Sequence, residues 1–443
     1  MVLPMTSVLE SGTQTVSQLQ PSQAAVICHY FLLAFPWLRE EPVLSKSLFL
    51  WEAVSIKSSR RLKFELLHFK ERKKKLFRNL MDQGRRPNAV VANDNSKIYM
   101  DLKSIIKEHT LPFLPAKSLF RFKGVCRDWK LQISTPFFAH NQSNSFHSVS
   151  GFFCQSCSNP PTFISLDPNS YGVPDPSLQF LPEPVDIRSS SNGLLCCQGR
   201  TGDNAYYICN PATKQWKKLP KPNADHGSNP AIVLIFEPSL LNFVAEYKLI
   251  CAFSSADFDN ALEFEIYSSA ENCWRISGEI YFGATKIKPN SGVHVNGIIY
   301  WLSKTGGIVV FDLTMERSQR LYGHKNGFYS HNHGCLGVMN EKLASVISSY
   351  NQTLTVSVLS NSYTNTMAMN SKVKAWDTKL SVNVGESPEY QGPVLYACED
   401  VIVIQSDRGL YSFDMKTREF GRLTSEADHD IRVVGYMNSL VEI

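Results

Sequence analysis

The sequence predicts a mainly β fold, a β-propeller of about six blades, preceded by a small helical domain. Beyond about residue 145, short runs with strand-like patterns are separated by Gly, Asn, Asp and Ser. Among these runs, one sequence unit recurs about every 51 residues. Ahead of them, about 40 residues carry apolar side chains at helical spacing. These three observations predict the helical domain first and the propeller after it.

Length and charge restrict the classes of function. The chain has 443 residues, enough for a large repeat domain and a smaller second domain. Its net charge of +5 depends on residues 57–78, which hold ten Lys and Arg against two Glu and leave the remaining chain at about −3. Because no basic field extends over the molecule, we expect no nucleic-acid partner.

Cysteine usage and hydropathy indicate the compartment. The chain has eleven cysteines, an odd number without paired spacing, and no cleavage site follows its first apolar run. We therefore expect a reducing environment, the cytoplasm and/or the nucleus. The most apolar stretch, residues 24–35, is shorter than the roughly 20 residues that a membrane helix needs. No membrane contact is expected.

Residues 1–97 are poorly patterned, and we expect an extension that is loosely ordered. It ends in the basic run "RRLKFELLHFKERKKKLFRNL", whose apolar residues allow an amphipathic helix. Two interpretations stay open for this run, a nuclear-import signal and a solvated helix without a role. The function of the extension is not assigned.

Residues 101–141 are predicted to form short helices. Prolines in "LPFLPAKS" interrupt the helical pattern, Pro115 suits the first turn of the next helix, and Pro136 ends the segment that follows. Between these prolines runs an apolar stripe with Arg and Lys at the intervening positions: Leu119, Phe122, Val125, Cys126 and Trp129.

Three interpretations compete for this stripe. A core would need more surrounding chain than about 40 residues, and a nucleic-acid reader would leave five apolar residues exposed. A face that buries its apolar residues against a partner protein meets both objections. We therefore expect Leu119 and Phe122 to lose exposed area on docking, with Arg121 and Lys123 at the rim.

The repeated unit beyond residue 145 predicts the blades. A strand ends at a turn residue, Thr or Glu follows three residues later, and an aromatic residue follows three later again. The copies are Asn210/Thr213/Trp216, Ser268/Glu271/Trp274 and Asp414/Thr417/Phe420, with looser copies at Asp312 and near Ser360. This is the period of a kelch-like blade, so each copy predicts the outer hairpin of a four-stranded sheet. Trp216 and Trp274 are expected to be buried.

Two features frame the repeated units. Two strand clusters precede the first copy, so about six blades fit residues 145–443. The C-terminal "IRVVGYMNSLVEI" is apolar and strand-like, and we expect it to complete the first blade and to remove a free edge.

The residue types of catalytic and metal sites occur without the spacing that those sites need. Cys154 and Cys157 follow His147, and a second cluster holds His324, His331, His333 and Cys335, but neither has the paired spacing of a zinc module. The chain has no G-x-S-x-G, phosphate-loop or H-E-x-x-H motif. We expect no catalytic residue, metal or cofactor, and we interpret the following as buried structural thiols: Cys196, Cys197, Cys209 and Cys251.

The segment "LPFLPAKSLFRFKGVCRDWKLQISTPFFAHN" resembles the F-box motif in its plant form. Farther along, "SSNGLLCC", "YYICNPATKQWKKLP", "FEIYSSAENCWR", "VNGIIYWLS" and "GGIVVFDL" resemble the F-box-associated propeller domain of plants. The resemblance implies a helical F-box at 101–141 and a propeller at 145–443, which follow the basic extension of unknown role at 1–97. In one departure from the family, Thr110 and Pro112 interrupt an otherwise acidic, aliphatic helix, so we expect a shortened first helix.

The resemblance also implies a partner and a function. It places Leu114, Pro115 and Leu119 at the contact with a Skp-type adaptor, and has Phe122, Val125 and Trp129 shared between contact and internal packing. The implied function is a non-catalytic substrate-receptor subunit of an SCF-type cullin-RING E3 ubiquitin ligase, which reaches a cullin through the adaptor. The substrate protein and its contact residues are unknown.

Two alternatives stay open. One is a propeller scaffold without a ligase role, which co-purification with the adaptor would distinguish. The other is a propeller enzyme such as a copper oxidase, which is normally secreted, whereas this chain shows no export signal.

Overall fold

The computed structural model describes residues 102–443 apart from 157–158, 170, 242, 284–286, 305–306, 323–333, 350–352, 361–375, 384–391, 426–427 and 429. The chain divides into two units, Met1–Met100 and Asp101–Ile443, and the described residues belong to the second. The extension at 1–97, the basic run within it, Cys157, His324, His331 and His333 lie outside the described residues.

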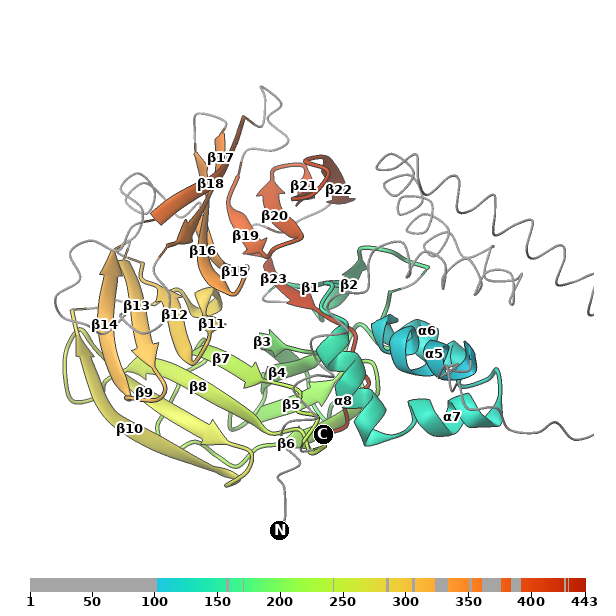
Figure 1. Cartoon of the computed structure of the whole chain (residues 1–443). Helices are drawn as coiled ribbons and strands as arrows, with labels where there is room; N and C mark the ends of the chain where they lie inside the picture. The colour runs from blue at the N-terminus through green and yellow to red at the C-terminus, as the bar shows by residue number, and fades with distance from the viewer. Residues whose placement is uncertain are drawn as a thin grey trace, which may run out of the picture. The chain divides into compact units, whose positions relative to one another are not determined.

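Short helices open the described part of the chain (Figure 1). They are α5 (Leu102–His109), the 3-10 turn η3 (Leu111–Phe113), α6 (Ala116–Phe122), α7 (Arg127–Ile133) and α8 (Pro136–Ser145). Prolines set several of these boundaries: Pro112 lies within η3, Pro115 caps α6, and Pro136 occupies the first turn of α8. The first helix is short, as its sequence predicts.

The apolar stripe is not one helix, which corrects the single face expected from its spacing. The chain leaves α6 after Phe122 and enters α7 at Arg127. Cys126 caps α7, since its sulfur accepts a hydrogen bond from the Trp129 backbone N–H at 3.5 Å. The residues of the stripe before and after this break therefore do not share the single helix face that their spacing predicts.

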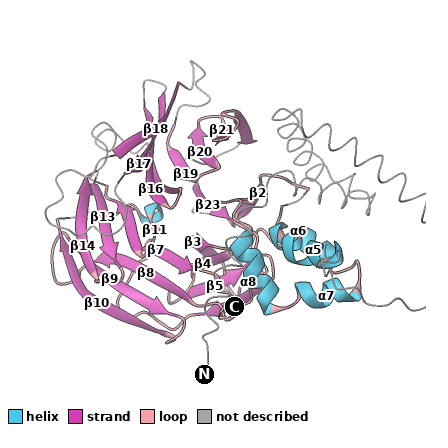
Figure 2. Cartoon of the chain, viewed as in Figure 1, coloured by secondary structure: helices cyan, strands magenta, loops and turns pink. Residues whose placement is uncertain are grey.

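The strands form six antiparallel sheets among the described residues (Figures 1 and 2). The first sheet has the order β2 (Thr162–Ser165), β1 (Gly151–Gln155) and β23 (Arg432–Tyr436). The next two hold β3 (Val185–Ser191), β4 (Leu194–Gly199), β5 (Tyr206–Asn210) and β6 (Gln215–Lys218), and then β7 (Ala231–Phe236), β8 (Tyr247–Ser254), β9 (Ala261–Ser268) and β10 (Cys273–Phe282).

Three further sheets complete the set, with the 3-10 turn η4 (Pro289–Ser291) between β10 and β11. They hold β11 (Val293–Val295), β12 (Ile298–Leu302), β13 (Gly307–Asp312) and β14 (Arg317–Tyr322); β15 (Gly334–Met339), β16 (Lys342–Ser349), β17 (Thr353–Leu359) and β18 (Trp376–Asn383); and β19 (Val394–Ala397), β20 (Val401–Ser406), β21 (Gly409–Asp414) and β22 (Phe420–Thr424). The predicted six-bladed propeller is confirmed.

The repeated sequence unit marks the outer hairpin of each four-stranded sheet. Asn210, Ser268, Asp312 and Asp414 end the third strand of their sheets, and Ser360 directly follows β17. The Asp414 carboxylate accepts hydrogen bonds from the Lys416 and Thr417 backbone N–H groups, both at 2.8 Å. The turn residue thus satisfies the backbone where the strand ends.

Apolar clusters fill the seams between neighbouring sheets and close the ring. Residues of β4, β5 and the C-terminus pack against β7–β10, and residues of β7–β9 pack against β12 and β13. Similar apolar clusters join the other neighbouring sheets. The last strand, β23, pairs with β1 from Gly151↔Tyr436 to Gln155↔Arg432. The predicted completion of the first blade by the C-terminal strand is confirmed.

The burial of the two repeat tryptophans differs, so half of that prediction is wrong. Trp274 is 6% exposed, whereas Trp216 is 42% exposed. Trp274 lies beneath the loop after β6, where its indole N–H donates to the Pro220 carbonyl oxygen at 2.9 Å. Trp216 lies on β6, a four-residue outer strand, and contacts the ring of Tyr207.

No described helix is long and apolar enough to cross a membrane.

Candidate functional site

The helical unit α5–α8 is the first candidate site, and its predicted contact residues lie mostly inside it. Leu119, Phe122 and Trp129 are buried, and the rings of Phe122 and Trp129 meet edge to face at 5.5 Å. Pro115 is also buried and Leu114 is half-buried. The expectation that Leu119 and Phe122 lose exposed area on docking is wrong, because the folded chain already covers them.

A different set of apolar side chains faces solvent on the same unit. Val125 was predicted and is exposed; the others are Phe113, Phe120, Leu131 and Phe137, of which Leu131 is 62% exposed. These four lie off the spacing that selected the stripe. The sequence offered one signal for their exposure, namely that they are apolar but lie outside the spacing of the stripe. A helix of two turns with apolar residues on two faces can bury only one of those faces.

Charged side chains also lie on the helical unit, and one of them contacts the exposed set. The Lys123 ammonium lies 5.1 Å from the centre of the Phe120 ring. Loss of hydration lowers the pKa of Lys123, and the nearby Glu442 carboxylate opposes that shift. Lys107 pairs with Asp128 at 2.7 Å between α5 and α7. The helical unit therefore presents exposed apolar side chains together with charged ones, a composition found at protein–protein interfaces.

Gln142 joins the helical unit to the propeller. Its amide nitrogen donates to the Leu114 carbonyl oxygen at 3.2 Å and to that of Asn438 at 3.1 Å. Its amide oxygen accepts from the Leu440 backbone N–H at 3.3 Å. Because Gln142 is fully buried, these bonds connect η3 and α8 with the C-terminal segment without competition from water.

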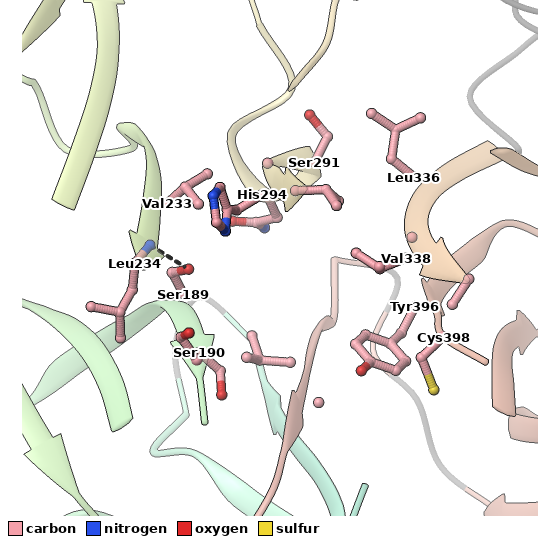
Figure 3. A pocket seen from close by; sticks show the side chains of 18 of the residues that line it. Ser189, Ser190, Val233, Leu234, Ser291, His294, Leu336, Val338, Tyr396 and Cys398 are labelled. Carbon is pink, nitrogen blue, oxygen red and sulfur yellow. Dashed lines mark hydrogen bonds between the residues drawn. The ribbon is translucent and has the colours of Figure 1, made fainter. Parts of the chain in front are cut away.

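The central channel of the propeller is the second candidate site (Figure 3). It holds a cavity of about 580 Å³ lined by the innermost strands β3, β7, β11, β15, β19 and β23. Figure 3 shows hydroxyl groups, His294, Tyr396 and Cys398 around this space. Such a cavity has room for a small polar molecule.

Several polar groups of the lining already make hydrogen bonds within the propeller. The Ser189 hydroxyl accepts from the Leu234 backbone N–H at 2.9 Å, and the Ser291 hydroxyl accepts from that of Leu302 at 2.8 Å. His294 Nε2 accepts from the Gly297 backbone N–H at 2.9 Å, which places the ring proton on Nδ1. Burial lowers the pKa of His294, against the effect of Glu237. The imidazole is therefore a neutral hydrogen-bond donor.

The channel thiols are poor nucleophiles. Burial raises the pKa of Cys335 to about 12, and Lys288 opposes that shift. Burial also raises the pKa of Cys398, although backbone N–H groups oppose the shift. Since the thiolate is the reactive form, neither side chain is activated for attack at neutral pH.

A buried His–Glu pair resembles catalytic machinery in its geometry. His226 Nε2 lies 2.8 Å from Glu265 Oε2, and His226 Nδ1 lies 3.0 Å from the Tyr206 hydroxyl. Burial acts to raise the pKa of Glu265, but hydrogen bonds from His226 and from the Asn223 and Ala224 backbone N–H groups outweigh it and lower that pKa. Both side chains are almost completely buried, and Glu265 also accepts from the Asn223 and Ala224 backbone N–H groups, so the pair holds the loop after β6.

The metal candidates gain no support in the described part of the chain. No group of three or more His, Cys, Asp or Glu side chains could hold a metal ion there. Cys154 is buried and His147 is exposed. The predicted buried thiols are confirmed, since Cys196, Cys197, Cys209 and Cys251 are fully buried.

Comparison with known proteins places this architecture in a family. Residues 173–443 match the family model of the F-box associated beta propeller domain. F-box protein At5g49610 of Arabidopsis thaliana is 32% identical over 206 residues, which cover 43% of this chain and 55% of that protein.

Two further Arabidopsis thaliana proteins show similar matches. F-box protein At5g07610 is 31% identical over 237 residues, covering 49% of this chain and 54% of that protein. F-box/LRR-repeat/kelch-repeat protein At2g27520 is 26% identical over 226 residues, covering 49% and 59%. The chain spans about half the length of the curated relatives it matches.

Proposed function

The chain belongs to the family defined by the F-box-associated β-propeller domain, and from this we propose that it is a substrate-receptor subunit of an SCF-type cullin-RING E3 ubiquitin ligase. In this role the helical unit α5–α8 docks on a Skp-type adaptor, which contacts a cullin, and the propeller binds a substrate protein. The relatives' names, which call them F-box proteins, support this assignment.

The exposed apolar side chains of the helical unit carry the proposal. The core of this unit is already complete, with Leu119, Phe122 and Trp129 buried, yet Phe120 and Leu131 remain in water. A large apolar residue that the fold leaves exposed gains free energy when a partner covers it, about 25 cal/mol per Å² before association costs. An adaptor surface is the partner that the F-box resemblance implies.

The mechanism is positioning. A receptor that holds its substrate near a ubiquitin-charged enzyme raises the effective concentration of the reacting groups, so the chemistry belongs to other subunits. The hydrogen bonds of Gln142 serve this mechanism, because they hold the docking unit against the propeller. The buried His226–Glu265 pair and the protonated channel thiols support a subunit without catalysis of its own.

We propose that the protein acts in the cytoplasm and/or the nucleus, since an odd number of cysteines without paired spacing fits a reducing environment. Imaging of a fluorescent fusion checks this location, and an exclusively secreted fusion would contradict it.

One observation favours a second candidate function, a propeller scaffold that no longer binds the adaptor. The first helix, α5, has only eight residues, and Pro112 prevents its continuation. A shortened helix offers less surface to an adaptor. Adaptor binding by the purified chain separates the two candidates.

The test measures binding of a purified Skp-type adaptor to the full chain. We expect a stable complex, and we expect the double change Phe120→Ala and Leu131→Ala to weaken it about tenfold or more, because both truncations remove apolar area at the contact. Met315→Ala is the matched control, since Met315 is comparably exposed on the turn between β13 and β14. If the folded double variant bound within a factor of about two of the unchanged chain, the docking face would be wrong.

A further inference from the structure

Two exposed phenylalanines form a pair on the β7–β10 sheet, far from the helical unit in sequence. Phe258 lies in the turn between β8 and β9, and Phe282 ends β10. Their ring centres are 5.6 Å apart with the planes at 75°. Phe258 is 47% exposed and Phe282 is 62% exposed, so each ring keeps much of its surface in water. Paired exposed aromatic rings are a frequent feature of binding surfaces.

The pair lies on the propeller face opposite the helical unit. The helix α8 contacts the turns that follow first strands: Ser143 donates to the Asn192 carbonyl oxygen between β3 and β4, and Phe137 meets the ring of Phe243 between β7 and β8. In an antiparallel sheet, turns after the first and third strands lie at one face, and those after the second and fourth lie at the other. Phe258 follows a second strand and Phe282 ends a fourth.

The turn that carries Phe258 is held in a fixed conformation. The Ser255 hydroxyl accepts from the backbone N–H groups of Asp257 and Phe258, both at 3.2 Å, and donates to the Glu263 carboxylate. The Gly283 backbone N–H donates to the Asn260 carbonyl oxygen at 3.3 Å, which ties the end of β10 to the same turn. Binding on this surface therefore costs little conformational entropy in the protein.

The charge around the pair selects the chemistry of its ligand. Asp257 and Asp259 are exposed on either side of Phe258. Their carboxylates have no ion pair or side-chain hydrogen bond with another described residue. A purely apolar ligand would remove water from both charges without replacing it, and a phosphate backbone would be repelled by them.

We propose that the Phe258–Phe282 pair, with Asp257 and Asp259, is a docking site for an arginine-containing basic segment of the substrate protein. A guanidinium group stacks on an aromatic face and also donates two parallel hydrogen bonds to a carboxylate, so it matches both features of this surface. This inference rests on the proposed function for the identity of the partner. It adds the class of segment that the propeller recognises.

The position of the site fits this role. A substrate held on the face opposite the helical unit leaves the adaptor contact free, so both partners bind at once. Phe258 lies in a loop and Phe282 ends a strand beside it, and loops of a rigid scaffold commonly carry binding residues.

The test uses the full chain and a fluorescent peptide in which arginine alternates with glycine. Fluorescence anisotropy should show saturable binding that weakens as salt rises, because part of the attraction is between charges. A peptide with citrulline in place of arginine keeps the shape and loses the charge, and we expect it to bind at least about fivefold more weakly. The double change Phe258→Ala and Phe282→Ala should reduce affinity for the arginine peptide by a similar factor.

Matched variants separate the pair from general surface effects. Asp257→Asn with Asp259→Asn should weaken the arginine peptide, whereas Asp203→Asn, on the turn between β4 and β5 of the same face, should not. Trp216→Ala removes an equally exposed aromatic ring elsewhere and should leave the affinity unchanged. Equal affinity for the arginine and citrulline peptides, or unchanged affinity in the Phe258/Phe282 double variant, would overturn the proposal.

Adaptor binding is measured on the same variants. Loss of peptide binding with the adaptor complex intact places the defect in this docking site. Failure of the unchanged chain to bind the adaptor, while the arginine peptide still binds the aromatic pair, contradicts the ligase role and leaves the docking site standing.

Discussion

Trp216 and Trp274 occupy equivalent positions of the repeated unit but have different surroundings. The centre of the Trp274 ring lies 5.3 to 5.5 Å from the centres of the Tyr206, Tyr267 and His226 rings, and its N–H donates a hydrogen bond to the Pro220 carbonyl oxygen. Trp216 contacts the Tyr207 ring and keeps 42% of its surface exposed. The same sequence position therefore contributes differently to the free energy of unfolding.

Changing Trp274 to Ala should lower the free energy of unfolding by about 3 to 5 kcal/mol, the cost of a large cavity in a packed core. Trp216→Ala is the matched control, with an expected loss of about 1 kcal/mol or less at an exposed site. Urea denaturation followed by circular dichroism measures both. Equal losses in the two variants would contradict the difference in burial.

At the scale of elements, the helical unit shows how short helices are positioned by their ends. Cys126 caps α7 through the Trp129 N–H, and the Thr135 hydroxyl caps α8 through the Phe138 N–H at 3.2 Å. Helices of seven residues have little stability of their own, so caps and tertiary contacts decide their directions. Gln142 supplies the contact that fixes α8 against the C-terminal segment.

Changing Gln142 to Met keeps the side-chain volume and removes all three hydrogen bonds. We expect the free energy of unfolding to fall by about 2 to 4 kcal/mol, because buried backbone groups of Leu114, Asn438 and Leu440 lose their partner. Limited proteolysis should cut earlier between α8 and β1. Asn144→Met, on the exposed side of the same helix, is the control. Stability equal to that of the unchanged chain would show that the hydrogen bonds of Gln142 do not hold the two parts together.

At the scale of the whole molecule, one strand closes the ring. Pairing between β1 and β23 brings residues about 280 positions apart into one sheet. The Arg432 guanidinium donates to the Ile187 carbonyl oxygen at 2.8 Å, which also connects the closing strand to the next blade. Closure covers an edge that an open ring would expose.

Removing residues 432–443 should abolish cooperative unfolding, because β1 loses its partner and two seams lose Val433 and Tyr436 from their apolar clusters. Urea denaturation and limited proteolysis check this, with a broad transition and rapid cleavage expected. Removing residues 1–97 is the control, since we expect that extension to be dispensable for adaptor binding and for the fold. A sharp, unchanged transition after removal of β23 would mean that the ring does not depend on this closure.

The sequence by itself determined the propeller, its blade period and its closing strand. Turn residues and alternating patterns depend on neighbours within a few positions, so Asn210, Ser268 and Asp414 are recognisable as strand ends from the residues beside them. The F-box resemblance likewise depends on one continuous segment, and the structure has short helices along it.

Only the tertiary structure decided which side chains face solvent. Leu119 and Phe122 are covered by packing within the helical unit, and Trp274 by a loop after the preceding blade. Phe258 and Phe282 meet because β8, β9 and β10 bring two turns together. Burial depends on the elements that pack against a residue, and these come from distant parts of the chain. A local pattern gives the shape of each element, and the contacts between elements give its exposed surface.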